Sequence, residues 1–311
     1  MQFPCREVAE LYRKIVVSKQ NFDSTFRISQ KEKHKHPVSR ESGHREMTEL
    51  KKLLHDCSEK VAPFKIVEIG GVEMRAFESE AVIELMAEVT AQRKSANVRG
   101  RGSRRIGLDN LFQIVKTKEG KVVFIDLYLL HLTSIPQSIK KFVALEDLNL
   151  QSNQISEITN LDGLDFLQTL NLAENKLQST VGLSTLKSLE HLVLSGNQIT
   201  KIEQLDQLKK LKNLQLNKNR NLLSLSGLKN LTELEELEVC VTSVRSVFAL
   251  RNSKKLKQLD LSSTRFSDLH ELDGFENLEE LNICSCALIP EKMTREKLAY
   301  WRAKLGNKLH K

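Results

Sequence analysis

The sequence of 311 residues has few aromatic residues: tryptophan, tyrosine and phenylalanine together make up 5% of it. It also lacks any run of about 18 consecutive apolar residues, so we expect no integral membrane protein. Its N-terminus, MQFPCREVAEL, carries charges where a signal peptide has its apolar segment, which disfavours export by that route. The cysteines are odd in number and lack framework spacing, and they are Cys5, Cys57, Cys240, Cys284 and Cys286. These features predict an intracellular protein, cytoplasmic or nuclear, with free thiols.

Motifs of catalysis and metal binding are also missing. The sequence contains no P-loop, no G-x-S-x-G and no H-E-x-x-H, so we expect neither an enzyme nor a cofactor. Histidine and cysteine side chains that could bind zinc do cluster early in the chain, at His34, His36, His44, His55 and Cys57. Since no C-x₂-C or H-x₃-H pair is present, a solvated polar stretch is favoured over a metal site. At Cys284 and Cys286, packing is favoured over zinc or redox chemistry for the same lack of partners.

A repeated pattern of leucines fills the second half of the chain. The segments LEDLNLQSNQISEI from Leu145, LQTLNLAENKLQST from Leu167 and LEHLVLSGNQITKI from Leu189 share the template L-x-x-L-x-L-x-x-N-x-L. Eight copies are recognisable, and each starts 22 or 23 residues after the one before; they begin at residues 122, 145, 167, 189, 211, 234, 256 and 278. A fixed period of this length predicts a solenoid, in which each repeat buries its apolar face against its neighbours.

The template also predicts the structure of one repeat. Each L-x-L core is expected to be a short strand whose leucines point inward, and the strands of successive repeats stack in parallel on the concave face. Asparagine at the ninth position can satisfy backbone groups where the chain leaves the strand, which predicts a ladder of Asn153, Asn175, Asn197 and Asn219. The other repeats have a different residue at the ninth position, namely Leu130, Thr242, Thr264 and Cys286. Because three of these lie in the last repeats, we expect the C-terminal repeats to be less tightly held. The return segments are short enough to be extended or 3₁₀ structure.

These eight repeats resemble the leucine-rich repeat family, in particular its 22-residue class, which includes bacterial internalins and the regulatory subunit of type-1 protein phosphatase. The resemblance implies a fold of class α/β, a solenoid of about eight repeats with a parallel β-sheet on its concave face. For the phosphatase regulator it further implies partner binding through acidic and aromatic side chains of that face. The aromatic candidates here are Phe124 and Tyr128.

The patterns within and around the repeats predict that the chain is divided into four parts. Residues 1–92 are expected to form a smaller N-terminal α+β region, with helices at 4–20 and 48–61, a flexible segment at 31–45, a hairpin across Gly70-Gly71 and a helix placing Val82, Leu85, Met86 and Val89 on one face. Residues 93–105 are expected to be a linker. The solenoid would cover 106–290, with an N-terminal hairpin turning at Glu119-Gly120. Residues 291–311 would form a helical cap, packed through Leu298, Tyr300, Trp301 and Leu305.

Charge is distributed unevenly along these parts. Residues 1–120 carry 23 Lys and Arg against 17 Asp and Glu, whereas residues 121–290 carry 18 against 21. The linker is the most basic segment, with a candidate polyanion-binding set of Arg93, Lys94, Arg99, Arg101, Arg104 and Arg105. A flexible Arg-Gly segment can bind RNA or an anionic surface, but a solvated linker is the favoured interpretation, because no aromatic residues interleave for base stacking.

The concave face is the candidate site for a protein partner. Template positions two, three, five, seven and eight project there, and they bring charges of mixed sign into columns across the strands. The candidate residues are Glu146, Asp147, Glu190, His191, Lys212, Glu235, Glu236, Glu238, Lys257, Asp260, Glu279 and Glu280. We therefore interpret the chain as a non-catalytic scaffold that binds protein through this face. Two alternatives remain: a ribonucleoprotein component whose basic ends contact RNA, and a protein phosphatase regulatory subunit.

Overall fold

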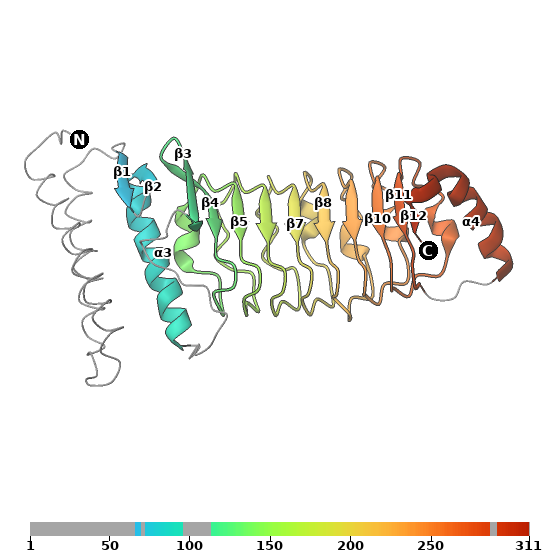
Figure 1. The fold of residues 1–311 in the computed structure, drawn as a ribbon, viewed down its shortest axis with the longest axis horizontal. Helices are drawn as coiled ribbons and strands as arrows, with labels where there is room; N and C mark the ends of the chain where they lie inside the picture. The colour runs from blue at the N-terminus through green and yellow to red at the C-terminus, as the bar shows by residue number, and fades with distance from the viewer. Residues whose placement is uncertain (1–65, 70–71, 96–112, 287–290, 311) are drawn as a thin grey trace, which may run out of the picture.

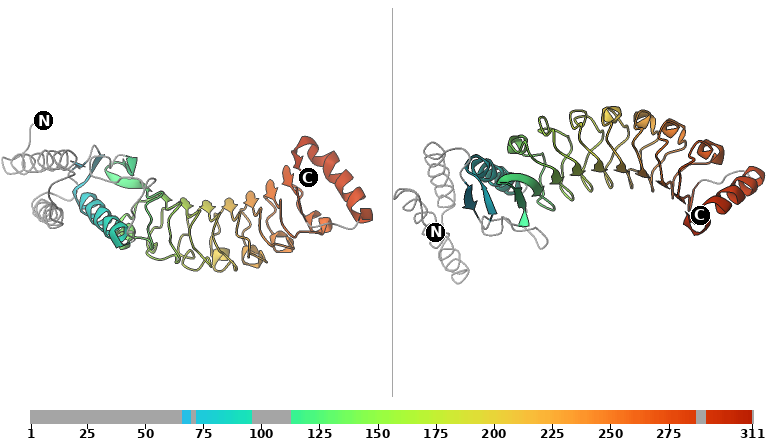
Figure 2. Two further views of the ribbon diagram at one scale, coloured as in Figure 1. Left: turned by 60° about the horizontal axis from the view of Figure 1, so that its bottom comes forward. Right: turned by 90° about the horizontal axis from the view of Figure 1, so that it is seen from above.

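The solenoid consists of eight parallel strands, one from each repeat (Figure 1). In the computed structural model the described residues are 66–69, 72–95, 113–286 and 291–310. The strands follow the predicted repeats one by one: β4 (Lys121–Asp126), β5 (Asp147–Asn149), β6 (Thr169–Asn171), β7 (His191–Val193), β8 (Asn213–Gln215), β9 (Glu236–Glu238), β10 (Gln258–Asp260) and β11 (Glu280–Asn282). The antiparallel β3 (Val115–Lys118) and the parallel β12 (Leu309–His310) extend the sheet at its two ends. Figure 2 shows the sheet on the inner side of the arc, so the predicted fold is confirmed.

The inside of the solenoid is a stack of leucines. Leu148, Leu170, Leu192 and Leu214 occupy the fourth template position on neighbouring strands and are buried, and so are the leucines of the first and sixth positions. The return segments are extended or single 3₁₀ turns, as predicted. These turns are η2 (Gln137–Lys141), η3 (Leu205–Gln207), η4 (Ser226–Leu228), η5 (Phe248–Leu250) and η6 (Leu269–Leu272).

The predicted asparagine ladder is present. The carboxamide oxygen of Asn197 accepts a hydrogen bond from the Leu177 N–H (3.0 Å), and its nitrogen donates to the Leu172 and Leu194 carbonyls (2.9 and 3.0 Å). Asn153, Asn175 and Asn219 bond in the same way between repeats. At the same position Thr242 and Thr264 each donate one hydrogen bond to a carbonyl of their own repeat. The C-terminal repeats therefore lack the inter-repeat amide bonds of the ladder.

The N-terminal end of the solenoid is covered by a hairpin and a long helix (Figure 1). The hairpin pairs β1 (Ile66–Ile69) with β2 (Val72–Arg75), and α3 (Ala76–Ser95) follows. The carboxylate of Glu88 accepts the backbone N–H groups of η2, and the side chain of Gln92 bonds the backbone at Thr133 and Ser134. The sequence pattern placed these elements in a separate region. In the structure, β2 and α3 instead share one hydrophobic core with the repeats.

The C-terminal end is covered by α4 (Glu291–Leu305), followed by η7 (Gly306–Lys308) and β12. Trp301 is buried and Leu298 packs against the core, as predicted. The prediction for Tyr300 holds only in part, because its ring makes a T-shaped contact with the Trp301 ring but the residue is 54% exposed. Lys304 connects α4 to the segment that follows η6, because its ammonium group donates hydrogen bonds to the carbonyls of Phe275 and Glu276 (3.0 and 2.9 Å).

Several predictions concern residues outside the described ranges. They include the helices at 4–20 and 48–61, the polar segment 31–45, the turn at Gly70-Gly71, most of the basic linker and the early histidine cluster.

Candidate interaction surface

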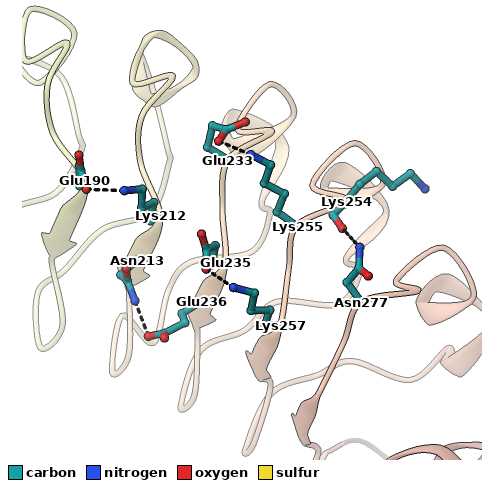
Figure 3. A network of polar contacts seen from close by, with 10 residues as sticks. All are labelled: Glu190, Lys212, Asn213, Glu233, Glu235, Glu236, Lys254, Lys255, Lys257 and Asn277. Atoms are coloured by element: carbon teal, nitrogen blue, oxygen red, sulfur yellow. Dashed lines mark hydrogen bonds and ion pairs between the residues drawn. The ribbon is translucent and has the colours of Figure 1, made fainter.

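The second template position forms a column of alternating charge along the edge of the concave face. The ammonium group of Lys212 lies 2.6 Å from the carboxylate of Glu190, and that of Lys257 lies 2.5 Å from Glu235 (Figure 3). These hydrogen bonds lower the pKa of both glutamates and raise the pKa of both lysines. Four of the predicted partner-binding residues therefore pair with each other between neighbouring repeats. The outer members of the column, Glu146 and Glu279, form no ion pair with a described residue.

The third position holds side chains that stand on the strands themselves. Asn213 donates a short hydrogen bond to the carboxylate of Glu236 on the next strand (Figure 3). Glu280 lies 3.6 Å from the imidazole of His310 on β12. Near the other end of the sheet, burial raises the pKa of Asp147, while Lys116 and His191 partly offset this effect. The third position therefore carries one carboxylate on each of β5, β9 and β11.

The fifth position carries a polar network across the middle of the face. Gln215 and Asn217 donate to the carboxylate of Glu238 (3.1 and 2.5 Å), and Asn282 donates to that of Asp260 (3.1 Å). Glu238 and Asp260 stand directly opposite each other in the register of β9 and β10. Because their side-chain donors are neutral amides, both residues keep a formal negative charge.

The field of these two carboxylates extends to the end of the strand. Burial first, and then the charges of Asp260 and Glu238, raise the pKa of the Cys240 thiol. Each of the twelve residues predicted for the site thus lies on the concave face or along its edge. Eight of them are brought together, four as ion pairs at the edge and four as an acidic group over β9–β11, whereas Glu146, Asp147, His191 and Glu279 belong to neither group. The sequence-based prediction missed the amide donors, although asparagine and glutamine recur at positions three, five and seven.

The candidate polyanion-binding set lies elsewhere. Arg93 and Lys94 belong to the last turn of α3, which continues to Ser95, rather than to a linker. Arg93 is half-buried, and this burial lowers its pKa. Arg99, Arg101, Arg104 and Arg105 lie outside the described residues.

The cysteines of the last repeats have surroundings that fit packing. The Cys286 thiol lies 3.1 Å from the Leu261 carbonyl and 3.6 Å from the Thr264 hydroxyl, and burial raises its pKa. Cys240, Cys284 and Cys286 are free thiols. Within the described ranges, no three His, Cys, Asp or Glu residues are grouped so as to hold a metal ion. Nor does any helix there have the length and apolar character needed to cross a membrane.

Comparisons with known proteins agree with this architecture. A family described as leucine-rich repeats (two copies) matches residues 165–207. An internalin, InlF of Listeria monocytogenes, is 26% identical with a TM-score of 0.55, over 73% of this chain and 61% of its own. Internalin C2 of the same species is 23% identical with a TM-score of 0.53, over 69% and 88%. TLR13, in a complex with the RNA ssRNA13, is 26% identical with a TM-score of 0.50, over 57% and 27%. No curated protein matches the sequence.

Eight stacked repeats of 22 or 23 residues with a sheet on the concave side define a leucine-rich repeat solenoid. Together with the family match and the similar structures, they show that the chain is a leucine-rich repeat protein. It spans about three fifths of the length of the InlF structure.

Proposed function

We propose that this protein is a non-catalytic, intracellular scaffold that binds a basic protein partner along its concave face. One observation carries the proposal: Glu236, Glu238, Asp260 and Glu280 lie on the three adjacent strands β9, β10 and β11. The first three accept side-chain hydrogen bonds from neutral amides, which position the carboxylates without neutralising them. Arginine or lysine side chains would complement such a surface.

The size of the concave face supports the same proposal. A standard interface needs about 800 Å² on each partner, which exceeds what one repeat offers. The sheet presents its outer face over eight parallel strands, and extended concave surfaces of this kind are how solenoid proteins engage partners. The helices α3 and α4 lie at the two ends of the stack and leave the concave face uncovered (Figures 1 and 2).

The phosphatase regulator remains an alternative within this proposal. At the first repeat, the ammonium group of Lys116 lies 4.5 Å from the centre of the Phe124 ring, and Tyr128 is exposed nearby in sequence. Phe124 is in register with Asp147 of β5 and so lies on the same sheet face as the acidic group, which supports this alternative. Co-purification of a protein phosphatase with the full chain would assign this function.

A photo-crosslinking experiment tests the general proposal. Gln258 on β10 is exposed and stands between Glu236 and Glu280 in the register of the sheet, so a photoreactive residue placed there reports on the acidic group. We expect a protein adduct from this position. Reversal of Glu238 and Asp260 to lysine should abolish it. The matched control places the photoreactive residue at Gln178, which is exposed outside the strands. An adduct from Gln178 alone, or one that survives the reversal, would contradict the proposal.

A further inference from the structure

A row of exposed side chains runs along the edge of the solenoid just before the strands begin. Its members lie at the two positions that precede the first leucine of a repeat; the same positions also hold Asp165 and the paired Glu233 and Lys255. We name it the Phe–Lys edge, and its members are Phe166, Lys187, Lys209, Lys210 and Lys254. All five are exposed, and they precede strands β6, β7, β8 and β10. At about 4.8 Å between strands, the row extends over about 19 Å.

The lysines of this edge keep their charge unneutralised. Lys209 and Lys254 donate to backbone carbonyls of the following repeat, at Asn230 (3.4 Å) and Gly274 (3.2 Å), which orients the side chains without cancelling their charge. Figure 3 shows the contrast with Lys255, whose ammonium group pairs with Glu233 at 2.6 Å. Lys187, Lys209, Lys210 and Lys254 form no ion pair with any residue in the described ranges.

Phe166 gives the edge its second chemical feature. Its side chain is 63% exposed, more than any other large apolar side chain in the described part of the chain. It precedes Lys187 by one repeat along the row. An exposed aromatic ring beside a line of cations is the combination with which proteins hold single-stranded nucleic acids: a base stacks on the ring, and the cations follow the phosphates.

We infer that the Phe–Lys edge binds a single-stranded nucleic acid of about four nucleotides, the lower end of the usual site size. The base at one end stacks on Phe166, and the phosphates that follow contact Lys187, Lys209 and Lys210. Carboxylates confine the strand to this line, since Asp165 bounds it beside Phe166 and the acidic concave face repels phosphates. This binding surface is separate from the concave face and opposite to it in charge, so the two partners could be bound together.

The first test measures the affinity of the full chain for a fluorescent single-stranded 15-mer, either oligo(U) or oligo(dT), by anisotropy at several salt concentrations. Changing Lys209 and Lys210 to glutamine should weaken binding and reduce the slope of log K against log salt by about 0.7 for each phosphate that the variant no longer neutralises. The matched control changes Lys176 and Lys201, two exposed lysines at other template positions, and should leave affinity and slope unchanged. The inference is wrong if the Lys209/Lys210 and Lys176/Lys201 variants show equal effects, or if the Lys209/Lys210 variant keeps its affinity. This holds even if residues 93–105 bind the oligonucleotide.

The second test separates stacking from charge. Phe166→Ala should weaken binding of the single strand about tenfold or more and leave binding of a 15-base-pair duplex unchanged, because duplex bases cannot stack on the ring. Phe248→Ala, which removes another exposed ring elsewhere on the solenoid, is the control and should have no effect. Two results would overturn the inference: tighter binding of the duplex than of the single strand, or a Phe166-dependent preference for phosphatidylserine vesicles or polyglutamate over the oligonucleotide.

Discussion

The ammonium group of Lys212 lies 2.6 Å from the carboxylate of Glu190, at the same template position of the neighbouring repeat. The next two repeats place Glu235 and Lys257 at that position, also paired, so the charge alternates along the stack. The repeat period creates this arrangement, because it brings residues 22 or 23 apart in sequence side by side. Charges that looked available to a partner are therefore partly used between repeats. The acidic group further along, on β9–β11, has mostly neutral amide partners instead of lysines.

The Glu190–Lys212 pair makes a prediction about titration. Changing Lys212 to glutamine removes the hydrogen bond and charge that lower the pKa of Glu190, so this pKa should rise towards 4.5. Because the folded-state pKa is depressed, the stabilisation from the pair exists above pH 4.5 and is lost as the pH falls through that lowered value. NMR titration of the glutamate side-chain carbons would show the change. Lys201→Gln should leave the Glu190 pKa where it is.

The asparagine ladder predicts unequal costs for two substitutions at the same template position. Asn197→Ala leaves one buried N–H and two buried carbonyls without their side-chain partner, whereas Thr242→Ala affects the Val239 carbonyl alone. At about 1–3 kcal/mol for each buried group left unsatisfied, the asparagine variant should lose clearly more stability. Urea unfolding gives the comparison, and faster hydrogen exchange of the Leu177 amide would locate the damage. Equal losses of stability would contradict the ladder's role between repeats.

The leucine periodicity was sufficient to predict the strands and the ladder, because both depend on contacts that recur with every repeat. The hairpin at Glu119-Gly120 occurs once and was predicted from its local turn sequence instead. The contacts of Glu88 and Gln92 with the first repeat do not recur in other repeats. The periodic pattern therefore could not predict that α3 packs on the first repeat. The same holds for the site. Template position placed the charged residues on the concave face, but which carboxylates pair with lysine and which accept from amides depends on the side chain one strand away.

Leu192 tests how strongly the stacked leucines contribute to stability. Its side chain is fully buried on β7 with strands on both sides, so Leu192→Ala should cost about 2–5 kcal/mol of unfolding free energy. The exposed neighbour His191 is the matched control, and His191→Ala should change the free energy by less than about 0.5 kcal/mol. Thermal and urea unfolding of the full chain would measure both. Similar values for the two variants would contradict the packing described for β7.

The C-terminal cap offers a second pair of adjacent residues with opposite expectations. Trp301 is 1% exposed and closes the end of the core, so Trp301→Ala should cost about 3–5 kcal/mol. Tyr300 lies largely in solvent, and Tyr300→Ala should have little effect. If the cap protects the last repeats, hydrogen exchange over β10 and β11 should accelerate in the tryptophan variant alone. Unchanged exchange there would show that α4 does not stabilise the solenoid.

A buried acid lies in the first turn of α3. Glu78 is 1% exposed, and its carboxylate oxygens make no side-chain hydrogen bond with described residues. Burial raises its pKa to about 7, although the backbone of Val122 and the charges of Arg75 on β2 and Lys121 on β4 partly offset this effect. The hairpin and helix that cover the first repeat therefore enclose a carboxyl group, Glu78, whose burial favours its protonated form.

Glu78 should make the stability of this end depend on pH. Below about pH 4.5 the side chain is protonated in both the folded and unfolded states and adds no pH dependence to the stability. Between pH 4.5 and about 7 the unfolded state releases its proton first, so stability falls, and above pH 7 the loss is complete. The shift corresponds to at most about 3 kcal/mol. Glu78→Gln should abolish this dependence and slow hydrogen exchange of α3 at pH 8, whereas Glu80→Gln, at an exposed position of the same helix, should preserve it. Urea unfolding at pH 5 and pH 8 would decide the matter: a wild-type pH dependence that persists in Glu78→Gln would assign it to another group.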